Sequence, residues 1–276
     1  MRLAFAGNPG ISVVTLDALV DAGHEVGVVV TSAPKRRGRG SARLPSPVEA
    51  AACRRGLDVS YEISDVVELN CDLCVVVAYG AMLRPPVLGG VPLVNLHFSL
   101  LPRWRGAAPV ERAILAGDTT TGVCVMEIEE GLDTGQVYAS RTTDVADKTL
   151  GELWNELSIT GTQLLLEWIA AGCPDGSPQV GEATYAHKLD RTDRHIDWSR
   201  SAKEILRVIR VGGAWTTQQG RVLKVWDATT SETASGVEVV TGTGESLVVT
   251  EVQPEGKAVM SASDWQRGLQ GSVRFE

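Results

Sequence analysis

The sequence predicts an α/β fold, with a Rossmann-like, mostly parallel sheet in an N-terminal domain and a small, OB-like β-barrel in a C-terminal domain. Up to about residue 170, short apolar runs alternate with amphipathic stretches, the pattern of parallel strands joined by crossover helices. From residue 214 onward, short β-rich runs are separated by glycines, which is typical of a small barrel. A length of 276 residues, 43% of them hydrophobic, suits one large or two modest globular domains.

The N-terminal elements follow from their apolar spacing and their capping residues. Apolar residues at helical spacing mark the helices, and Ser46 before Pro47 is a typical helix start. The expected strands are Leu3–Ala6, Val26–Val30, Leu73–Val77 and Leu93–Leu96, followed by a strand pair at Val123–Ile128 and Gln136–Ala139. The expected helices are Ser12–Ala22, Pro47–Arg55, Ala108–Ala116 and Thr149–Ala171.

The C-terminal part begins after Pro174–Ala186, which is rich in Gly, Pro and Ser and is the expected linker. A helix is expected at Ala202–Val211, and strands at Val222–Trp226, Gly236–Val240, Leu247–Glu251 and Val273–Phe275. These limits predict a catalytic domain at 1–173, a junction at 174–200 and a β-barrel domain at 201–276.

Overall charge and cysteine pattern exclude several classes of protein. The net charge of −8 argues against a general polyanion binder. Cys71 and Cys74 form a C-x-x-C pattern, but it enters an apolar run and no second ligand pair follows, so we expect no metal. Neither a secretory signal nor a membrane span is expected, which predicts a cytoplasmic protein whose five cysteines are reduced.

Two loops that follow strands are candidates for anion binding. Between residues 33 and 55, only Glu49 opposes a run of basic side chains: Lys35, Arg36, Arg37, Arg39, Arg43, Arg54 and Arg55. Interleaved glycines indicate a loop, which fits either anion binding or a solvated charged face. The turn Gly7–Gly10 lacks the third glycine of the dinucleotide-binding pattern, and Pro9 has no N–H to offer a phosphate. A structural turn is therefore the favoured interpretation of Gly7–Gly10.

Asn95, His97 and Asp133 are the strongest candidates for chemistry. Asn95 and His97 project to the same side of a strand, at the carboxyl end where open α/β sheets place their ligands. Asp133 lies between Gly131 and Gly135 in an expected turn, and a carboxylate can orient an imidazole and stabilise its protonated form. Each cluster alone is also typical of structural residues, but together they favour a catalytic site.

Longer stretches around these residues carry a family resemblance. Asn95–Pro109, NLHFSLLPRWRGAAP, resembles the signature of the 10-formyltetrahydrofolate-dependent formyltransferases. Arg112–Asp118, RAILAGD, and Glu129–Gly135, EEGLDTG, resemble the branch of that family that acts on methionyl-tRNA. Tyr185–Lys188 and Ile196–Trp198 are similar to its interdomain junction, and the β-rich tail is similar to its barrel-like C-terminal domain.

The resemblance implies formyl transfer from 10-formyltetrahydrofolate, a folate co-substrate, to the α-amino group of methionine on initiator tRNA. The residue types suit this reaction, because an amine that attacks a formyl carbon creates an oxyanion. Asn95 and His97 can donate hydrogen bonds to that oxyanion. His97 can also carry the proton from the amine to the folate nitrogen, with Asp133 orienting it. The reaction needs no covalent enzyme intermediate.

The resemblance also implies binding residues and leaves two alternatives open. It places the folate against Ser99, Leu100, Leu101 and Pro102, near Tyr79 and Gly80. It assigns tRNA phosphates to Arg36, Arg37, Arg39 and Arg43, with a contribution from the C-terminal domain of a monomer. Phe98 and Gln136 depart from the family pattern. A formyltransferase acting on an amino sugar nucleotide, or a non-catalytic nucleic-acid-binding relative, would share much of this sequence.

Overall fold

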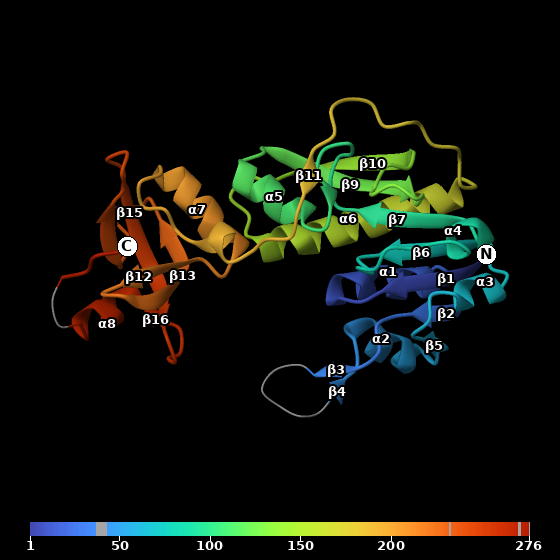
Figure 1. Ribbon diagram of the computed structural model, residues 1–276, viewed down its shortest axis with the longest axis horizontal. Coiled ribbons are helices and arrows are strands. Elements are labelled where there is room, and N and C mark those ends of the chain that lie inside the picture. The colour runs from blue at the N-terminus through green and yellow to red at the C-terminus, as the bar shows by residue number, and fades with distance from the viewer. Residues whose placement is uncertain (37–42, 232, 270–271, 276) are drawn as a thin grey trace. The chain divides into compact units, whose positions relative to one another are not determined.

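The computed structural model describes residues 1–36, 43–231, 233–269 and 272–275. The chain divides into two compact units, which we describe one at a time (Figure 1). The first unit comprises Met1–Pro109, Thr120–Asp144 and Trp154–Ala186, and the second comprises Val110–Thr119, Val145–Leu153 and His187–Glu276. No helix in the described ranges is long and apolar enough to cross a membrane.

A seven-stranded sheet forms the centre of the first unit, in the order β10-β9-β7-β6-β1-β2-β5. Its strands are β1 (Arg2–Gly7), β2 (Glu25–Val30), β5 (Val59–Ser60), β6 (Leu73–Val77), β7 (Leu93–His97), β9 (Thr120–Glu127) and β10 (Val137–Asp144). The five strands from β7 to β5 are parallel, whereas β9 runs antiparallel to β7 and β10 to β9. The predicted mostly parallel α/β sheet is confirmed.

Helices pack on both faces of this sheet. They are α1 (Gly10–Asp21), α2 (Pro47–Arg55), α3 (Asp65–Glu68), α4 (Val87–Gly90) and α6 (Leu150–Ala170), whose first turn belongs to the second unit. The buried hydroxyls of Thr15 in α1 and Thr162 in α6 lie 2.8 Å apart, so these two helices share one face. On the other face, Ala4 and Ala6 of β1 pack in a cluster with Val66 of α3 and Val87 of α4.

The Gly7–Gly10 turn has a structural role. The Asn8 side chain accepts hydrogen bonds from the Thr31 hydroxyl at 2.9 Å and the Ser32 N–H at 2.7 Å, and it donates to the Tyr79 carbonyl. It therefore ties together the segments that follow β1, β2 and β6. A Cβ on Gly7 would lie 2.9 Å from the Val77 carbonyl oxygen, so glycine is needed for the close approach of the two strands.

Short paired segments complete the first unit. Lys35–Arg36 (β3) pairs with Arg43–Leu44 (β4), and Arg105–Gly106 (β8) pairs in parallel with Tyr185–Ala186 (β11). Ser46 caps α2 as predicted, because its hydroxyl accepts from the Glu49 N–H at 2.9 Å.

The second unit contains a curled antiparallel sheet in the order β12-β13-β15-β14, with β16 on β15, which forms half of a barrel (Figure 1). Its elements are α5 (Pro109–Ala116), η1 (Thr192–Arg194), α7 (Ala202–Val211), β12 (Trp215–Gln218), β13 (Arg221–Thr229), β14 (Val237–Val240), β15 (Ser246–Pro254), β16 (Met260–Ser261) and α8 (Ala262–Arg267). The predicted strand at Val273–Phe275 is wrong: only Phe275 forms an isolated bridge, to Gln218. The Phe275 ring stacks instead on Trp198, with centroids 4.8 Å apart.

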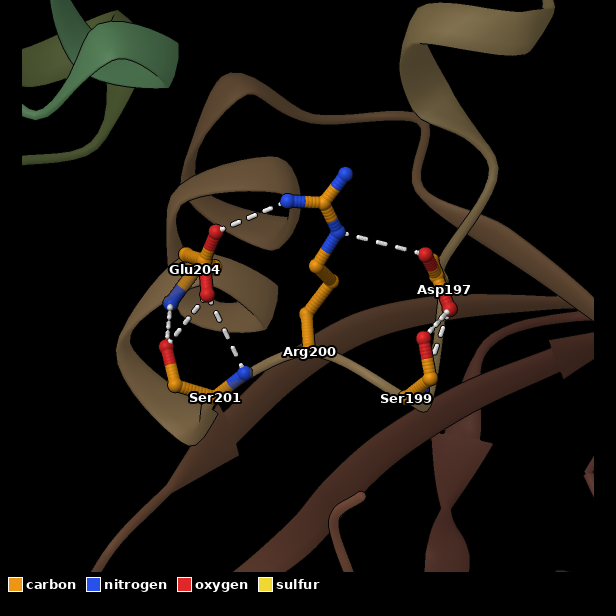
Figure 2. A network of polar contacts seen from close by, with 5 residues as sticks. All are labelled: Asp197, Ser199, Arg200, Ser201 and Glu204. Carbon is orange, nitrogen blue, oxygen red and sulfur yellow. Dashed lines mark hydrogen bonds and ion pairs between the residues drawn. The ribbon is translucent and has the colours of Figure 1, made fainter. Parts of the chain in front are cut away.

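A network of polar contacts fixes the start of α7 (Figure 2). Ser201 and Glu204 form a capping box, in which the Ser201 hydroxyl accepts from the Glu204 N–H and the Glu204 carboxylate accepts from the Ser201 N–H. Arg200 donates to Glu204 and to Asp197, both at 3.3 Å, and the Ser199 hydroxyl donates to Oδ1 of Asp197 at 2.6 Å. The network joins the helix start to the Ile196–Trp198 stretch noted in the sequence.

Candidate active site

The carboxyl end of β7 presents Asn95 and His97 on one face of the sheet. Because side chains alternate along a strand, Asn95 and His97 lie on the same face of the sheet as Leu93. This face packs against α3 and α4. His97 is only 4% exposed. Asn95 is partly exposed, and its amide makes no hydrogen bond to the residues that the structure describes. An amide in this position is free to bind a ligand.

The His97 ring lies between a backbone carbonyl and a carboxylate. Its Nε2 is 2.9 Å from the Trp104 carbonyl oxygen, and its Nδ1 is 3.6 Å from Oδ2 of Asp133. Because a carbonyl can only accept, Nε2 carries the proton of the neutral ring. Nδ1 then directs a lone pair toward Asp133, and this contact becomes attractive only when the ring gains a second proton, on Nδ1. The predicted partnership of His97 and Asp133 is present, and it is suited to receiving a proton.

Asp133 is held in a strained turn. Its backbone φ of 51° lies in the left-handed region, which is uncommon for a residue with a side chain. Its Oδ2 accepts the Gly106 N–H at 2.7 Å. Gly135 is needed for close approach, since a Cβ there would lie 2.2 Å from the Glu127 carbonyl oxygen. The turn was predicted from flanking glycines, but Asp133 itself adopts the positive φ.

The loop after His97 is fixed by its own hydrogen bonds. The buried Ser99 hydroxyl donates to the Arg103 carbonyl at 2.5 Å, and the Trp104 N–H donates to the Thr184 hydroxyl at 2.9 Å. Leu100, Leu101 and Pro102 between them are partly exposed. This loop carries the Trp104 carbonyl that binds His97, so its fold determines the orientation of the imidazole.

Phe98 points away from the site. Like Leu96, it lies on the α6 face, where its ring packs edge-on against Trp154 with centroids 4.8 Å apart. It is 4% exposed. The departure of Phe98 from the family pattern is therefore accommodated by packing against α6, and not by crowding of Asn95 and His97.

The other predicted binding residues lie on two separate segments. Tyr79 packs against the α3 and α4 face, where burial raises the pKa of its hydroxyl, and Gly80 beside it is exposed with a φ of 79°. Arg36 and Arg43 are exposed and directly opposite each other in the β3–β4 pair. Arg37 and Arg39 lie outside the described residues.

The C-x-x-C pattern is part of the core. Cys71 and Cys74 are buried in the α3 and α4 cluster, and burial raises the pKa of both thiols. The Cys71 thiol donates weakly to the Val66 carbonyl at 3.8 Å. Across the described ranges, no group of three or more His, Cys, Asp or Glu side chains is arranged to hold a metal ion.

Sequence reasoning missed Gln179. Its amide donates to the carbonyls of Asp133 and Gly135, both at 2.8 Å. Gln179 lies in the Gly- and Pro-rich segment that was interpreted as a linker, and no local pattern distinguishes it there. Arg105, which donates to Gln179, lies in the Asn95–Pro109 stretch, where the sequence alone indicates no separate role for it.

The chain is similar to formyl transferases over nearly its whole length. Residues 1–169 match the family described as formyl transferase, and residues 188–270 match the formyl transferase C-terminal domain. The methionyl-tRNA formyltransferase of a Jannaschia species is 41% identical over 97% of each chain. That of Dinoroseobacter shibae is 40% identical over 100% of each chain.

Solved structures with low sequence identity share the fold. The methionyl-tRNA formyltransferase from Clostridium thermocellum has a TM-score of 0.61 at 12% identity, covering 95% of this chain and 99% of that one. HypX from Aquifex aeolicus in complex with tetrahydrofolic acid has a TM-score of 0.68 at 17% identity, covering 99% of this chain and 50% of that one. An N-formyltransferase from Helicobacter canadensis, in complex with folinic acid and dTDP-3-aminofucose, has a TM-score of 0.69 at 17% identity, covering 92% of this chain and 99% of that one.

Proposed function

This chain belongs to the formyl transferase family, and we propose that it transfers a formyl group from 10-formyltetrahydrofolate to the α-amino group of methionine carried on initiator tRNA. The observation that carries the proposal is the His97 ring between the Trp104 carbonyl and Asp133, on the same face as Asn95. The substrate assignment rests on relatives that match at about 40% identity over nearly the full chain, and those relatives are methionyl-tRNA formyltransferases.

In the proposed reaction, the neutral amine attacks the formyl carbon and forms a new C–N bond. The carbonyl oxygen becomes an oxyanion that accepts a hydrogen bond from the Asn95 amide. Nδ1 of His97 takes a proton from the attacking nitrogen, and Asp133 stabilises the resulting imidazolium. The protonated Nδ1 then donates to the folate nitrogen as its bond to the formyl carbon breaks. The products are tetrahydrofolate and N-formylmethionyl-tRNA, and the enzyme returns to its starting state.

We assign the two substrates to different parts of the chain. The folate would lie along Ser99–Pro102 and beside Tyr79 and Gly80. Because the Ser99 hydroxyl is engaged with the Arg103 carbonyl, Ser99 would contribute through its backbone. Arg36 and Arg43, together with Arg37 and Arg39, would bind tRNA phosphates. Two like charges directly across a strand pair repel each other, and a bound polyanion would relieve that repulsion.

The proposed domain limits are those of the sequence: a catalytic domain at 1–173, a junction at 174–200 and a C-terminal domain at 201–276 that assists tRNA binding. The chain would act as a monomer.

The test is formyl transfer by the purified protein with 10-formyltetrahydrofolate as donor, comparing methionyl-initiator tRNA with a dTDP-amino sugar as acceptor. We expect turnover with methionyl-initiator tRNA as acceptor and none with the dTDP-amino sugar. Turnover with the sugar nucleotide alone would replace the proposal by the amino sugar alternative. Folate binding without turnover of either acceptor would favour a non-catalytic relative.

A further inference from the structure

Gln179 stands out in the segment that joins the end of α6 to β11. Residues on both sides of it are exposed, and the next residue, Val180, is 87% exposed, whereas Gln179 is partly buried. Its amide makes four hydrogen bonds. Nε2 donates to the Asp133 and Gly135 carbonyls, each at 2.8 Å, and Oε1 accepts from Nε and Nη2 of Arg105 at 3.1 and 2.7 Å.

These partners require a glutamine. The two carbonyls can only accept and the guanidinium can only donate, so they fix which end of the amide faces which partner. A glutamate of the same length would keep the contact with Arg105 but would lose both donors to the turn. The side-chain amide thus links the backbone of the Asp133 turn to the β8 strand.

The same two-residue strand also binds the Asp133 side chain. Gly106, next to Arg105 in β8, donates its N–H to Oδ2 of Asp133 at 2.7 Å. Arg105 holds Gln179, which in turn holds the backbone of the turn. Gly106 holds the carboxylate that faces His97. A positive φ is unfavourable for a residue with a side chain and persists only where the surrounding structure holds it. Gln179 supplies two of the hydrogen bonds that hold the Asp133 turn in this conformation.

We propose that Gln179, held by Arg105, is a positioning residue that keeps the Asp133 carboxylate in line with Nδ1 of His97. This inference deepens the proposed function and rests on it. Gln179 does not contact the reacting atoms, so it acts on the rate only through Asp133.

The first test is steady-state kinetics of Gln179→Ala with methionyl-tRNA and 10-formyltetrahydrofolate. Displacement of a catalytic group by about 1 Å can cost on the order of 100-fold in rate, so we expect kcat to fall by about 10- to 100-fold with both KM values unchanged. Gln179→Glu keeps the Arg105 contact and should fall by a similar factor. Val180→Ala, on the adjacent exposed residue, is the matched control and should behave like the parent.

A double-mutant cycle separates positioning from a general structural role. In an Asp133→Ala background, Gln179→Ala should have no further effect on kcat, because the group that it positions is gone. An undiminished loss in that background would overturn the proposal, as would full activity of Gln179→Glu or a change confined to KM.

A readout that does not depend on turnover distinguishes this inference from the proposed function. The Gly106 amide proton, observed by NMR in the intact protein, should shift upfield in Gln179→Ala and Gln179→Glu as its bond to Asp133 weakens, and should stay in place in Val180→Ala. If the parent does not formylate methionyl-tRNA, the proposed function fails, and the Gly106 signal still decides whether Gln179 positions Asp133. An unmoved Gly106 signal in both variants would contradict the inference.

Discussion

Asn95 is the residue whose role can be tested most simply. Its amide is partly exposed beside a buried His97, and replacement by alanine removes one hydrogen-bond donor from the proposed oxyanion site. Loss of such a donor typically costs about 10²–10³ in rate. We expect Asn95→Ala to lower kcat by that factor at saturating substrates, measured by steady-state formyl transfer. A variant that changes only KM would show that Asn95 binds substrate in the ground state.

Gly135 tests the backbone of the Asp133 turn. A Cβ at this position would lie 2.2 Å from the Glu127 carbonyl oxygen, so Gly135→Ala must displace the turn that carries Asp133. We expect activity to fall on the order of 100-fold. The overpacking should also lower the free energy of unfolding by about 1–3 kcal/mol, which would be measured as a lower melting temperature.

Gly151 provides the matched control for Gly135. It lies in α6, where a Cβ would meet nothing within 4 Å. Gly151→Ala should keep full activity and should not lower the melting temperature, because the added Cβ meets no other atom. Equal behaviour of the two alanine variants would contradict the steric argument.

The candidate catalytic residues Asn95, His97 and Asp133 stand out in the sequence, whereas the side chain that supports them in the fold does not. Asn95 and His97 follow from strand alternation at a sheet end, and Asp133 follows from its glycine-rich turn. Gln179 acts only because the fold brings residues 174–186 alongside that turn, a contact between positions more than 40 apart in the chain. Local composition there indicates only a linker.

At the scale of elements, strands and helices with clear periodicity were predictable, and short ones were not. The parallel strands β1, β2, β6 and β7 and the helix α7 fall close to their expected limits, whereas the two-residue parallel strand β5 was not expected. The helix α8 has only six residues and was missed, since it is too short to show an apolar stripe. Val273–Phe275 has strand-like residues, but the Phe275 ring packs between Trp198 and Trp265, and this packing replaces a strand pairing.

The α7 capping network predicts a pH-dependent stability (Figure 2). Hydrogen bonds from Ser199 lower the pKa of Asp197 below its usual 3.8, and those from Ser201 lower the pKa of Glu204 below its usual 4.5. Because both pKa values are lower in the folded state, the stabilisation is complete above the usual values. It is lost as the pH falls through the folded-state values.

Ser201→Ala checks this account. Loss of the N-cap should reduce the free energy of unfolding by about 1 kcal/mol at pH 7, measured by denaturant unfolding of the intact chain. The difference from the parent should shrink as the pH falls below the usual value of 4.5 and through the lower folded-state pKa of Glu204, where its carboxylate protonates. Lys203→Ala, exposed in the same helix, should show little change at any pH. A Ser201→Ala effect that grows on acidification would contradict the assignment.

At the scale of the whole molecule, a protein with a net charge of −8 must bind a polyanion through a local basic surface. We expect Arg36→Ala and Arg43→Ala each to weaken methionyl-tRNA binding and to reduce the slope of log affinity against log salt by about one, with kcat at saturating tRNA unchanged. Filter binding across a salt series measures this.

Arg2 is the control for that experiment. It lies at the amino end of β1, where it pairs with Glu25 at 3.2 Å, away from the carboxyl ends of the parallel strands. Arg2→Ala should leave the salt slope unchanged. If all three variants lower the slope equally, binding would reflect overall charge and not the β3–β4 segment.

In the proposed reaction, the Asp133–His97 pair moves the proton during formyl transfer. The most direct measurement is the single-turnover rate of Asp133→Asn with methionyl-tRNA and 10-formyltetrahydrofolate, since this substitution keeps the size of the side chain and removes its charge. Loss of acid–base catalysis predicts a rate lower by about 10²–10⁴ with both substrates still bound. A single-turnover rate close to that of the parent would show that Asp133 takes no part in the chemistry.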